Sequence, residues 1–83
     1  MTEKQKEYIN ANLQAFIYNF GPVRIERETG YGFYVYYPAD SEDYMFFGED
    51  IKTIDGWLYG AVQAVHRIVP IKAKQNIHAF IDG

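Results

Sequence analysis

The spacing of apolar residues changes twice along this chain, and these changes limit the folds that it can adopt. Near the N-terminus, apolar residues recur every three or four positions, which is the period of one face of an α-helix. The middle of the chain alternates apolar and polar residues with period two, as strands do. After Gly48 the helical spacing returns. This order predicts a single α+β domain over residues 1–83, with helices packed on one face of a sheet.

The first helix is predicted over about residues 3–19. Thr2 and Gln5 have the spacing of a capping box, in which each residue satisfies a free backbone N–H of the other. Gly21 and Pro22 then end the helix, because glycine accepts the left-handed cap conformation and proline cannot continue the helical hydrogen bonding. The predicted buried stripe of this helix consists of Ile9, Leu13, Phe16, Ile17 and Phe20.

Three strands are predicted to follow and to form an antiparallel meander. Residues 23–29 and 33–37 alternate in hydrophobicity on either side of a glycine-containing turn, and residues 44–47 make a short third strand after an acidic turn at 39–43. The face that packs on the helices is expected to carry Val23, Ile25, Phe33, Val35, Tyr37, Met45 and Phe47. The opposite face, called the open face below, is expected to carry Arg24, Glu26, Glu28, Tyr34, Tyr36, Tyr44 and Phe46.

The second helix is predicted from about Thr53 to Val69, with Thr53 or Asp55 as its N-cap and Pro70 at its end. Trp57 is expected to fill the core from the first turn of this helix. Residues 71–81 are predicted to form a short final helix, and an edge strand there fits the same residues. The apolar stripe of the second helix consists of Ile51, Ile54, Leu58, Ala61, Val62, Val65 and Ile68.

The open face carries four aromatic residues, an arrangement that resembles the base-stacking platform of RNA-recognition domains. Its charges argue against that function, because nucleic-acid binders neutralise phosphates with Lys and Arg, and this face has two Glu and one Arg. No direct binding of nucleic acid is therefore expected. Tyr34 and Tyr36 then either stabilise the sheet, alone or beneath a further element, or contact a protein partner. Because eight Tyr and six Phe exceed what one small core holds, some rings are expected at the surface.

Residues with catalytic or metal-binding chemistry are few and scattered. The only serine, Ser41, lies among carboxylates that oppose formation of an alkoxide, and His66 and His78 belong to no metal-binding motif. The chain has no cysteine and therefore no thiol chemistry. We expect a protein that is not an enzyme and has no cofactor and no metal site. Because no signal peptide begins the sequence and no apolar run approaches the roughly 20 residues that span a bilayer, a cytoplasmic location without membrane contact is expected.

Residues 38–56 hold six of the eleven acidic residues and one lysine, a local charge of −5 in a chain of net charge −3. We interpret this stretch as an anionic docking edge with aromatic anchors inside it. Charges accelerate association, whereas anchors supply affinity, because exposed ion pairs contribute only about 0–1 kcal/mol each. Acids at the start of the second helix also stabilise its positive N-terminus. The residues expected to bind a partner are Asp40, Glu42, Asp43, Tyr44, Phe46, Glu49, Asp50, Tyr34 and Tyr36.

With its acidic stretch at residues 40–55 and its predicted α-β-β-β-α order, the chain resembles small phage-encoded anti-CRISPR proteins. These proteins inhibit the type II RNA-guided DNA endonuclease by placing carboxylates where DNA phosphates would bind. The resemblance implies an inhibitor in the host cytoplasm whose partner is a protein with a basic nucleic-acid-binding surface. The alternative is a homo-oligomeric structural or accessory protein that uses the Tyr-rich open face as its self-interface. Attraction between the mildly basic C-terminal end of one copy and the acidic stretch of another would also give a homodimer.

Overall fold

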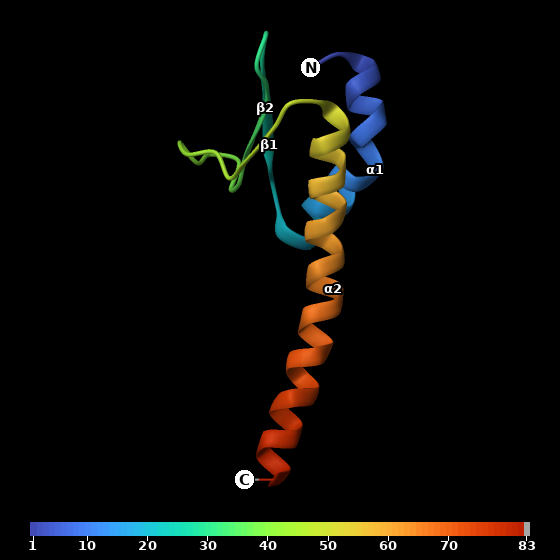
Figure 1. Ribbon diagram of the computed structural model, residues 1–83, viewed down its shortest axis with the longest axis vertical. Helices are drawn as coiled ribbons and strands as arrows, with labels where there is room; N and C mark the ends of the chain where they lie inside the picture. Colours follow the sequence, from blue (N-terminus) through green and yellow to red (C-terminus); the bar gives the residue numbers. More distant parts are fainter. Residues whose placement is uncertain (83) are drawn as a thin grey trace.

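The computed structural model describes the backbone of residues 1–82 and the side chains of residues 1–67. The chain forms two layers, a three-stranded antiparallel sheet and a layer of two helices on one face of it (Figure 1). The elements follow in the order α1 (Glu3–Phe20), β1 (Arg24–Glu28), β2 (Gly32–Tyr36), β3 (Phe46–Gly48) and α2 (Ile51–Asp82). The predicted α+β class and the order of its elements are confirmed.

Helix α1 has the predicted ends. The Thr2 hydroxyl accepts a hydrogen bond from the Gln5 N–H at 3.2 Å, and the Gln5 side chain accepts one from the Thr2 N–H at 2.9 Å, which completes the capping box. At the other end, Gly21 has a φ of 106° and donates its N–H to the Ile17 carbonyl at 2.8 Å. A side chain at this φ would be strained, so glycine is suited to turning the chain from α1 toward the sheet.

The sheet has the strand order β1-β2-β3, so β2 is central and β1 and β3 are its edges. In β1 and β2, Arg24 pairs with Tyr36 and Glu26 with Tyr34. These four residues lie on the open face, as predicted from the period of two. The Tyr31 N–H closes the hairpin between the two strands by donating to the Glu28 carbonyl at 3.0 Å.

The core lies between the two layers and draws on both helices and on β2. Trp57 is half-buried, with its ring centroid 5.6 Å from that of Phe16 on α1 and 5.2 Å from that of Phe46 on β3. It therefore fills the core from the first turns of α2, as predicted. Burial of these apolar side chains is the main force that holds α1 and α2 against the sheet. The buried hydrophobic residues among residues 1–67 are Ile9, Phe16, Phe33, Val35, Ile54, Leu58 and Val62.

The predicted faces of the third strand are wrong. Phe46 packs against the core and stacks on Trp57, whereas Phe47 lies against Tyr34 on the open face, and Met45 is 55% exposed. Because successive side chains of a strand alternate, an error of one residue exchanges the two faces. The Met45 N–H donates to the Val35 carbonyl at 2.7 Å while Phe46 is the pairing partner of Val35, so two residues of this strand face one residue of β2. Such a bulge shifts the alternation in a way that an all-apolar segment cannot reveal.

Helix α2 begins two residues earlier than predicted, and its cap is Asp50 rather than Thr53 or Asp55. The Asp50 carboxylate accepts hydrogen bonds from the Thr53 N–H and the Thr53 hydroxyl, each at 2.8 Å. This is the N-cap geometry that satisfies a free donor of the first turn. Asp55 instead accepts a hydrogen bond from the Asn12 amide at 3.0 Å and so joins α2 to α1.

The two helices predicted on either side of Pro70 form one helix in the structure, α2. Proline removes one backbone donor and strains the preceding turn, yet a long helix can contain one. The alternative of an edge strand over 71–81 is wrong, because these residues belong to α2. The side chains of Ile68 and of the predicted final helix over residues 71–81 lie outside the residues whose side chains are described.

Candidate protein-docking site

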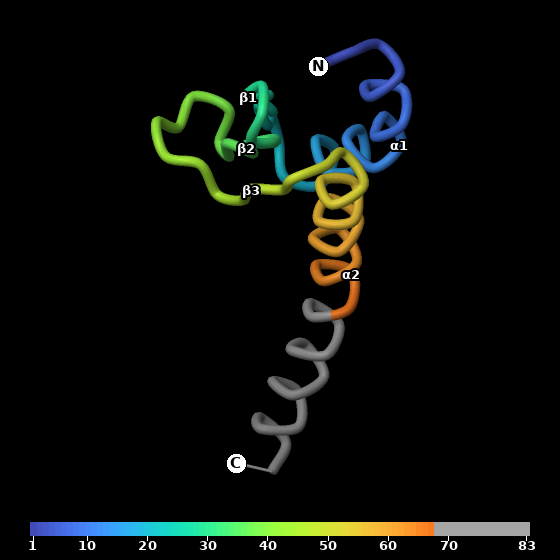
Figure 2. The backbone as a smooth tube through the Cα atoms, turned by 45° about the horizontal axis from the view of Figure 1, so that its top comes forward, coloured from blue at the N-terminus to red at the C-terminus, as the bar shows by residue number. Residues whose placement is uncertain are grey.

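The segment between β2 and β3, residues 37–45, is called the acidic loop below. It extends on the side of the sheet away from the helices (Figures 1 and 2). Hydrogen bonds that tie the middle of this loop to the rest of the protein run from the Ala39 N–H to the Pro22 carbonyl at 3.1 Å and from the Arg24 guanidinium to the Ser41 carbonyl at 2.8 Å. The Ser41 hydroxyl bonds only with the backbone of Asp43 among the described residues, at 3.0 and 3.3 Å. Ser41 therefore shapes the loop.

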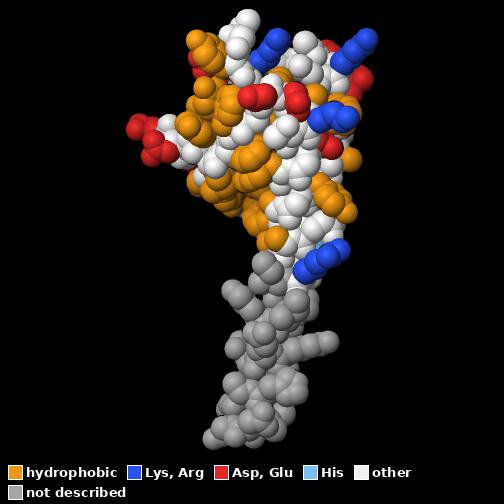
Figure 3. Space-filling view, viewed as in Figure 1, with side chains coloured by type: hydrophobic (Ala, Val, Ile, Leu, Met, Phe, Trp, Pro, Cys, Tyr) orange, Lys and Arg blue, Asp and Glu red, His pale blue; other side chains and the backbone are white. Residues whose placement is uncertain are grey.

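The acidic loop carries three exposed carboxylates, those of Asp40, Glu42 and Asp43, and no lysine or arginine. None of these carboxylates forms an ion pair with a cation of residues 1–67. Figure 3 shows acidic side chains gathered at a tip that projects from the body of the molecule. A local charge of −3 therefore faces solvent on this loop, and it remains available to a cationic partner.

Arg24 is the cation that contacts the acidic loop, and it is already engaged. Its guanidinium lies 2.7 Å from the Glu26 carboxylate, donates to the Ser41 carbonyl and sits 4.1 Å from the centroid of the Tyr36 ring. Stacking of a guanidinium on an aromatic ring is favourable and covers the ring. Tyr36 is consequently half-buried. Arg24 therefore covers the ring that Tyr36 was expected to present to a partner.

Three aromatic side chains, Tyr34, Tyr44 and Phe47, form a cluster on the open face. The Tyr34 ring centroid lies 5.0 Å from that of Tyr44 and 5.0 Å from that of Phe47. The pKa of the Tyr34 hydroxyl is raised above its ordinary value, mainly by hydrogen bonding to the Glu28 carboxylate and to a smaller extent by desolvation. Tyr44 is 54% exposed, whereas Tyr34 is half-buried between its neighbours. The open face is thus partly covered by Tyr44 of the acidic loop and by Phe47 of β3.

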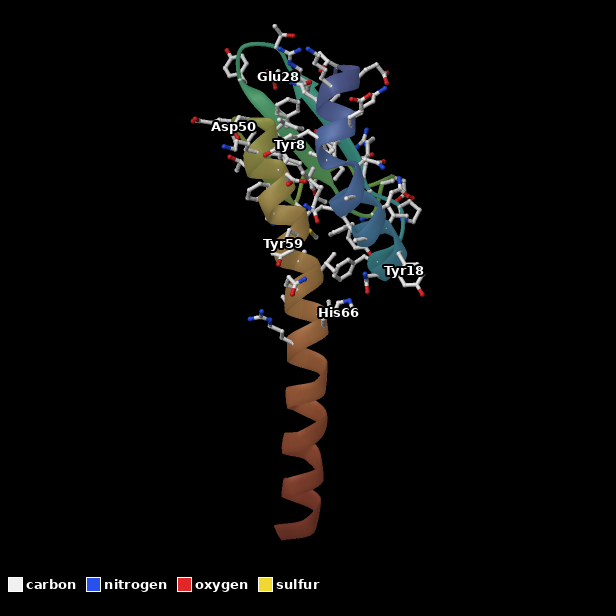
Figure 4. The ribbon with its side chains drawn as sticks, turned by 90° about the vertical axis from the view of Figure 1, so that its right-hand side faces the viewer. Tyr8, Tyr18, Glu28, Asp50, Tyr59 and His66 are labelled. Atoms are coloured by element: carbon white, nitrogen blue, oxygen red, sulfur yellow. The ribbon has the colours of Figure 1, made fainter. Side chains whose placement is uncertain are left out.

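Glu49 and Asp50 lie at the opposite end of β3 from the acidic loop, about 10 Å away for a strand of three residues. The hydrogen bond from the Thr53 N–H lowers the pKa of Asp50, and this carboxylate is committed to capping α2. Glu49 and Asp50 line a pocket of about 380 Å³ together with Glu28 and Arg27. The positively charged side chain of Arg27 therefore lies near the acids at this end of β3. Figure 4 shows Glu28 and Asp50 at this same end of the molecule.

The predicted site residues therefore divide into separate groups. The structure brings Asp40, Glu42, Asp43 and Tyr44 together on one loop and places Tyr34 beside them. Phe46 belongs to the core, and Met45 takes its place as the exposed apolar residue next to Tyr44. The exposure of Met45 could not be predicted from the sequence. All four residues of the segment 44–47 are apolar or aromatic, so either choice of core face gives an apolar face.

Other aromatic rings are exposed on the helices, as the composition predicted. Tyr8, Tyr18 and Tyr59 are 51%, 90% and 54% exposed and stand out from the helical layer (Figure 4). His66 is also exposed, and the side chain of His78 lies beyond the described residues. Single exposed rings are common on protein surfaces, so these residues define no site by themselves.

In comparisons with known proteins, no family model matches the chain, and no curated protein and no solved structure shows a significant similarity to it. Over the described part of the chain, none of the helices combines the length and the apolar character needed to cross a membrane. Within the same residues, His, Cys, Asp and Glu side chains form no group of three that could hold a metal ion.

Proposed function

We propose that this protein is a small non-enzymatic inhibitor, encoded by a phage, that binds the basic groove of a nucleic-acid-handling enzyme in the manner of anti-CRISPR proteins. The acidic loop makes the first contact, and Tyr44 and Met45 supply apolar contact beside it. One observation carries this proposal. Three carboxylates without an ion pair among residues 1–67 project on one loop, directly next to two apolar side chains that are each more than half exposed.

The two kinds of group have different physical roles in such a complex. Carboxylates on a projecting loop attract a basic groove over a distance of about 8–10 Å at moderate salt and so raise the association rate. They add little affinity while they remain exposed to water. Tyr44 and Met45 lose solvent contact on docking and slow dissociation, as buried anchors do. The hydrogen bonds from Ala39 and Arg24 hold the acidic loop in place, which reduces the entropy lost on binding.

The alternative, self-association through Tyr34 and Tyr36, has less support from the geometry. Arg24 covers the Tyr36 ring, and Tyr34 lies between Tyr44 and Phe47. Light scattering coupled to size-exclusion chromatography distinguishes the two proposals. A stable dimer that dissociates on the substitution Tyr34→Ala would favour the alternative, whereas a monomer at micromolar concentration favours the inhibitor.

The proposal is tested with two variants that remove equal charge from different places. Glu42→Gln/Asp43→Asn neutralises the tip of the acidic loop, and Glu3→Gln/Glu7→Gln neutralises two exposed acids of α1. The probe is a purified type II RNA-guided DNA endonuclease with its guide RNA, the partner that the resemblance indicates. Association and dissociation rates are measured over a salt series, together with cleavage of target DNA.

We expect the wild-type protein to inhibit cleavage and the loop variant to associate about tenfold more slowly at low salt, with a flatter salt dependence. The α1 variant should associate nearly as fast as the wild type. Tyr44→Ala should instead raise the dissociation rate. If the two charge variants associate equally fast at every salt concentration, the acidic loop is not the docking element. If no binding to the endonuclease is detected, that partner is excluded, and an affinity capture from host lysate identifies which basic protein to measure.

A further inference from the structure

An apolar pocket of about 310 Å³ lies where the end of α1 meets the start of the acidic loop. Its walls come from two segments that are far apart in sequence, the turn after α1 and the turn after β2. Among the residues whose side chains the structure describes, Asp40 is the one charged residue that lines it. The lining residues are Phe20, Pro22, Tyr37, Pro38, Ala39 and Asp40.

The walls of this pocket are held in place by contacts within the protein. The Tyr37 hydroxyl donates a hydrogen bond to the Phe20 carbonyl, and the Ala39 N–H donates one to the Pro22 carbonyl at 3.1 Å. The rings of Phe20 and Tyr37 also pack on the buried Phe16, at centroid distances of 4.6 and 5.5 Å. A pocket whose walls are tied to each other and to the core exists before any ligand binds, so little ordering is needed on binding.

The chemistry of the lining selects the kind of group that fits. Apolar walls favour the methylene stem of a long side chain, and a carboxylate at the rim favours a positive charge at its tip. Arginine suits both features, because its weakly hydrated guanidinium can lie against an aromatic ring while it pairs with a carboxylate. Glu42 and Asp43 follow Asp40 within the same loop and raise the negative potential around the rim.

We propose that this pocket binds one arginine side chain of the protein partner, with its stem lying against the Phe20 and Tyr37 rings, which contact each other at a centroid distance of 6.2 Å, and its guanidinium at Asp40. The proposal rests on the proposed function for the source of the arginine, since a nucleic-acid-binding groove is rich in arginine. It adds a specific anchor point to the docking site, on the side of the acidic loop that faces the end of α1.

The test uses two short peptides and the isotope-labelled full-length protein in an NMR titration. One peptide is acetyl-Gly-Gly-Arg-Gly-Gly-amide, and the other replaces arginine by the uncharged analogue citrulline. The arginine peptide should shift the backbone amide signals of Gly21, Ala39 and Asp40 in a saturable way. The dissociation constant of the citrulline peptide should be about fivefold higher, which is the upper range for one exposed ion pair.

Two variants locate the binding within the pocket. Asp40→Asn keeps the shape of the side chain and should raise the dissociation constant of the arginine peptide to that of the citrulline peptide. Glu7→Gln removes one charge from α1 and should leave it unchanged. Ala39→Leu should abolish the shifts by filling the pocket while all charges remain, and Ala11→Leu, at an exposed position of α1, serves as its control.

Equal affinity for the two peptides, or shifts at Glu42 and Asp43 without shifts at Gly21 and Ala39, would overturn the proposal. Should Ala39→Leu perturb folding, Asp40→Asn still decides the outcome. The result is separable from the test of the proposed function. Loss of the pocket with retained binding to the endonuclease removes only the arginine anchor, whereas loss of endonuclease binding with intact arginine binding removes only the proposed partner.

Discussion

Replacing Gly32 with alanine tests the packing of β3 on β2, which positions the acidic loop and the aromatic cluster. Gly32 has a φ of 151°, and a Cβ atom added there would lie 2.5 Å from the Gly48 carbonyl oxygen and 2.9 Å from the Phe47 ring. The oxygen belongs to the backbone of the neighbouring strand and cannot rotate away. Alanine would therefore push β3 outward and displace the ring that packs on Tyr34.

The expected cost follows from two contributions. A side chain at this φ adds strain of about 1–2 kcal/mol, and forced overpacking adds about 1–3 kcal/mol, so we expect a loss of about 2–5 kcal/mol in the free energy of unfolding. Small domains have only about 5–15 kcal/mol in total. The assay is urea unfolding followed by circular dichroism, and at a slope of about 1–3 kcal/mol/M the midpoint should fall by roughly 0.7–5 M.

Two other glycines of the chain provide matched controls. Gly30 has a φ of 87° and no atom within 4 Å of an added Cβ, so Gly30→Ala should show the strain alone, about 1–2 kcal/mol. Gly60 lies in α2 with open space around it, and Gly60→Ala should stabilise the protein by about 0.5–1 kcal/mol. If Gly32→Ala unfolds at the same urea concentration as Gly30→Ala, the close approach of β3 to β2 is wrong, and so is the placement of Phe47.

Three further predictions concern the strand, the helix cap and nucleic acid. Phe46→Ala should cost about 2–4 kcal/mol and Met45→Ala less than about 0.5 kcal/mol in urea unfolding, and the reverse order would mean that Met45 rather than Phe46 faces the core. Asp50→Ala should lower the thermal midpoint at neutral pH. Folding lowers the pKa of Asp50, so its stabilisation is complete above the ordinary carboxyl pKa of about 4 and is lost as the pH falls through the lower folded value. The difference between Asp50→Ala and the wild type should therefore vanish in acid. Labelled single- and double-stranded DNA and RNA should show no measurable anisotropy change at physiological salt, and micromolar binding that weakens with salt would contradict the charge argument.

The parts of the fold that were predicted correctly depend on residues close together in the sequence. Thr2 and Gln5 are one helical turn apart. Gly21 and Pro22 end α1 through backbone conformation alone, which depends only on these two residues and the last turn of the helix. The faces of β1 and β2 follow from a clear alternation of apolar and polar residues. In the candidate site, Asp40, Glu42 and Asp43 lie on one exposed loop, as the acidic turn predicted over residues 39–43 implies, whereas Tyr44, predicted as the first residue of the third strand, also lies in that loop because β3 begins at Phe46.

The sequence by itself determined the order of the first helix, the three strands and the helix that follows them, most of the core and the position of the negative charge, because helical and strand periods and local caps act over a few residues. The tertiary structure alone decided which side chains of residues 44–47 face the core, because a bulge opposite Val35 sets that alternation. It also decided that Arg24 covers Tyr36, that Asp55 bonds to Asn12 across 43 residues, and that Phe20 and Tyr37 enclose a pocket beside Asp40. These features depend on contacts between segments that are distant in the sequence. The packing of the whole core determines those contacts, and a local sequence pattern carries no information about them.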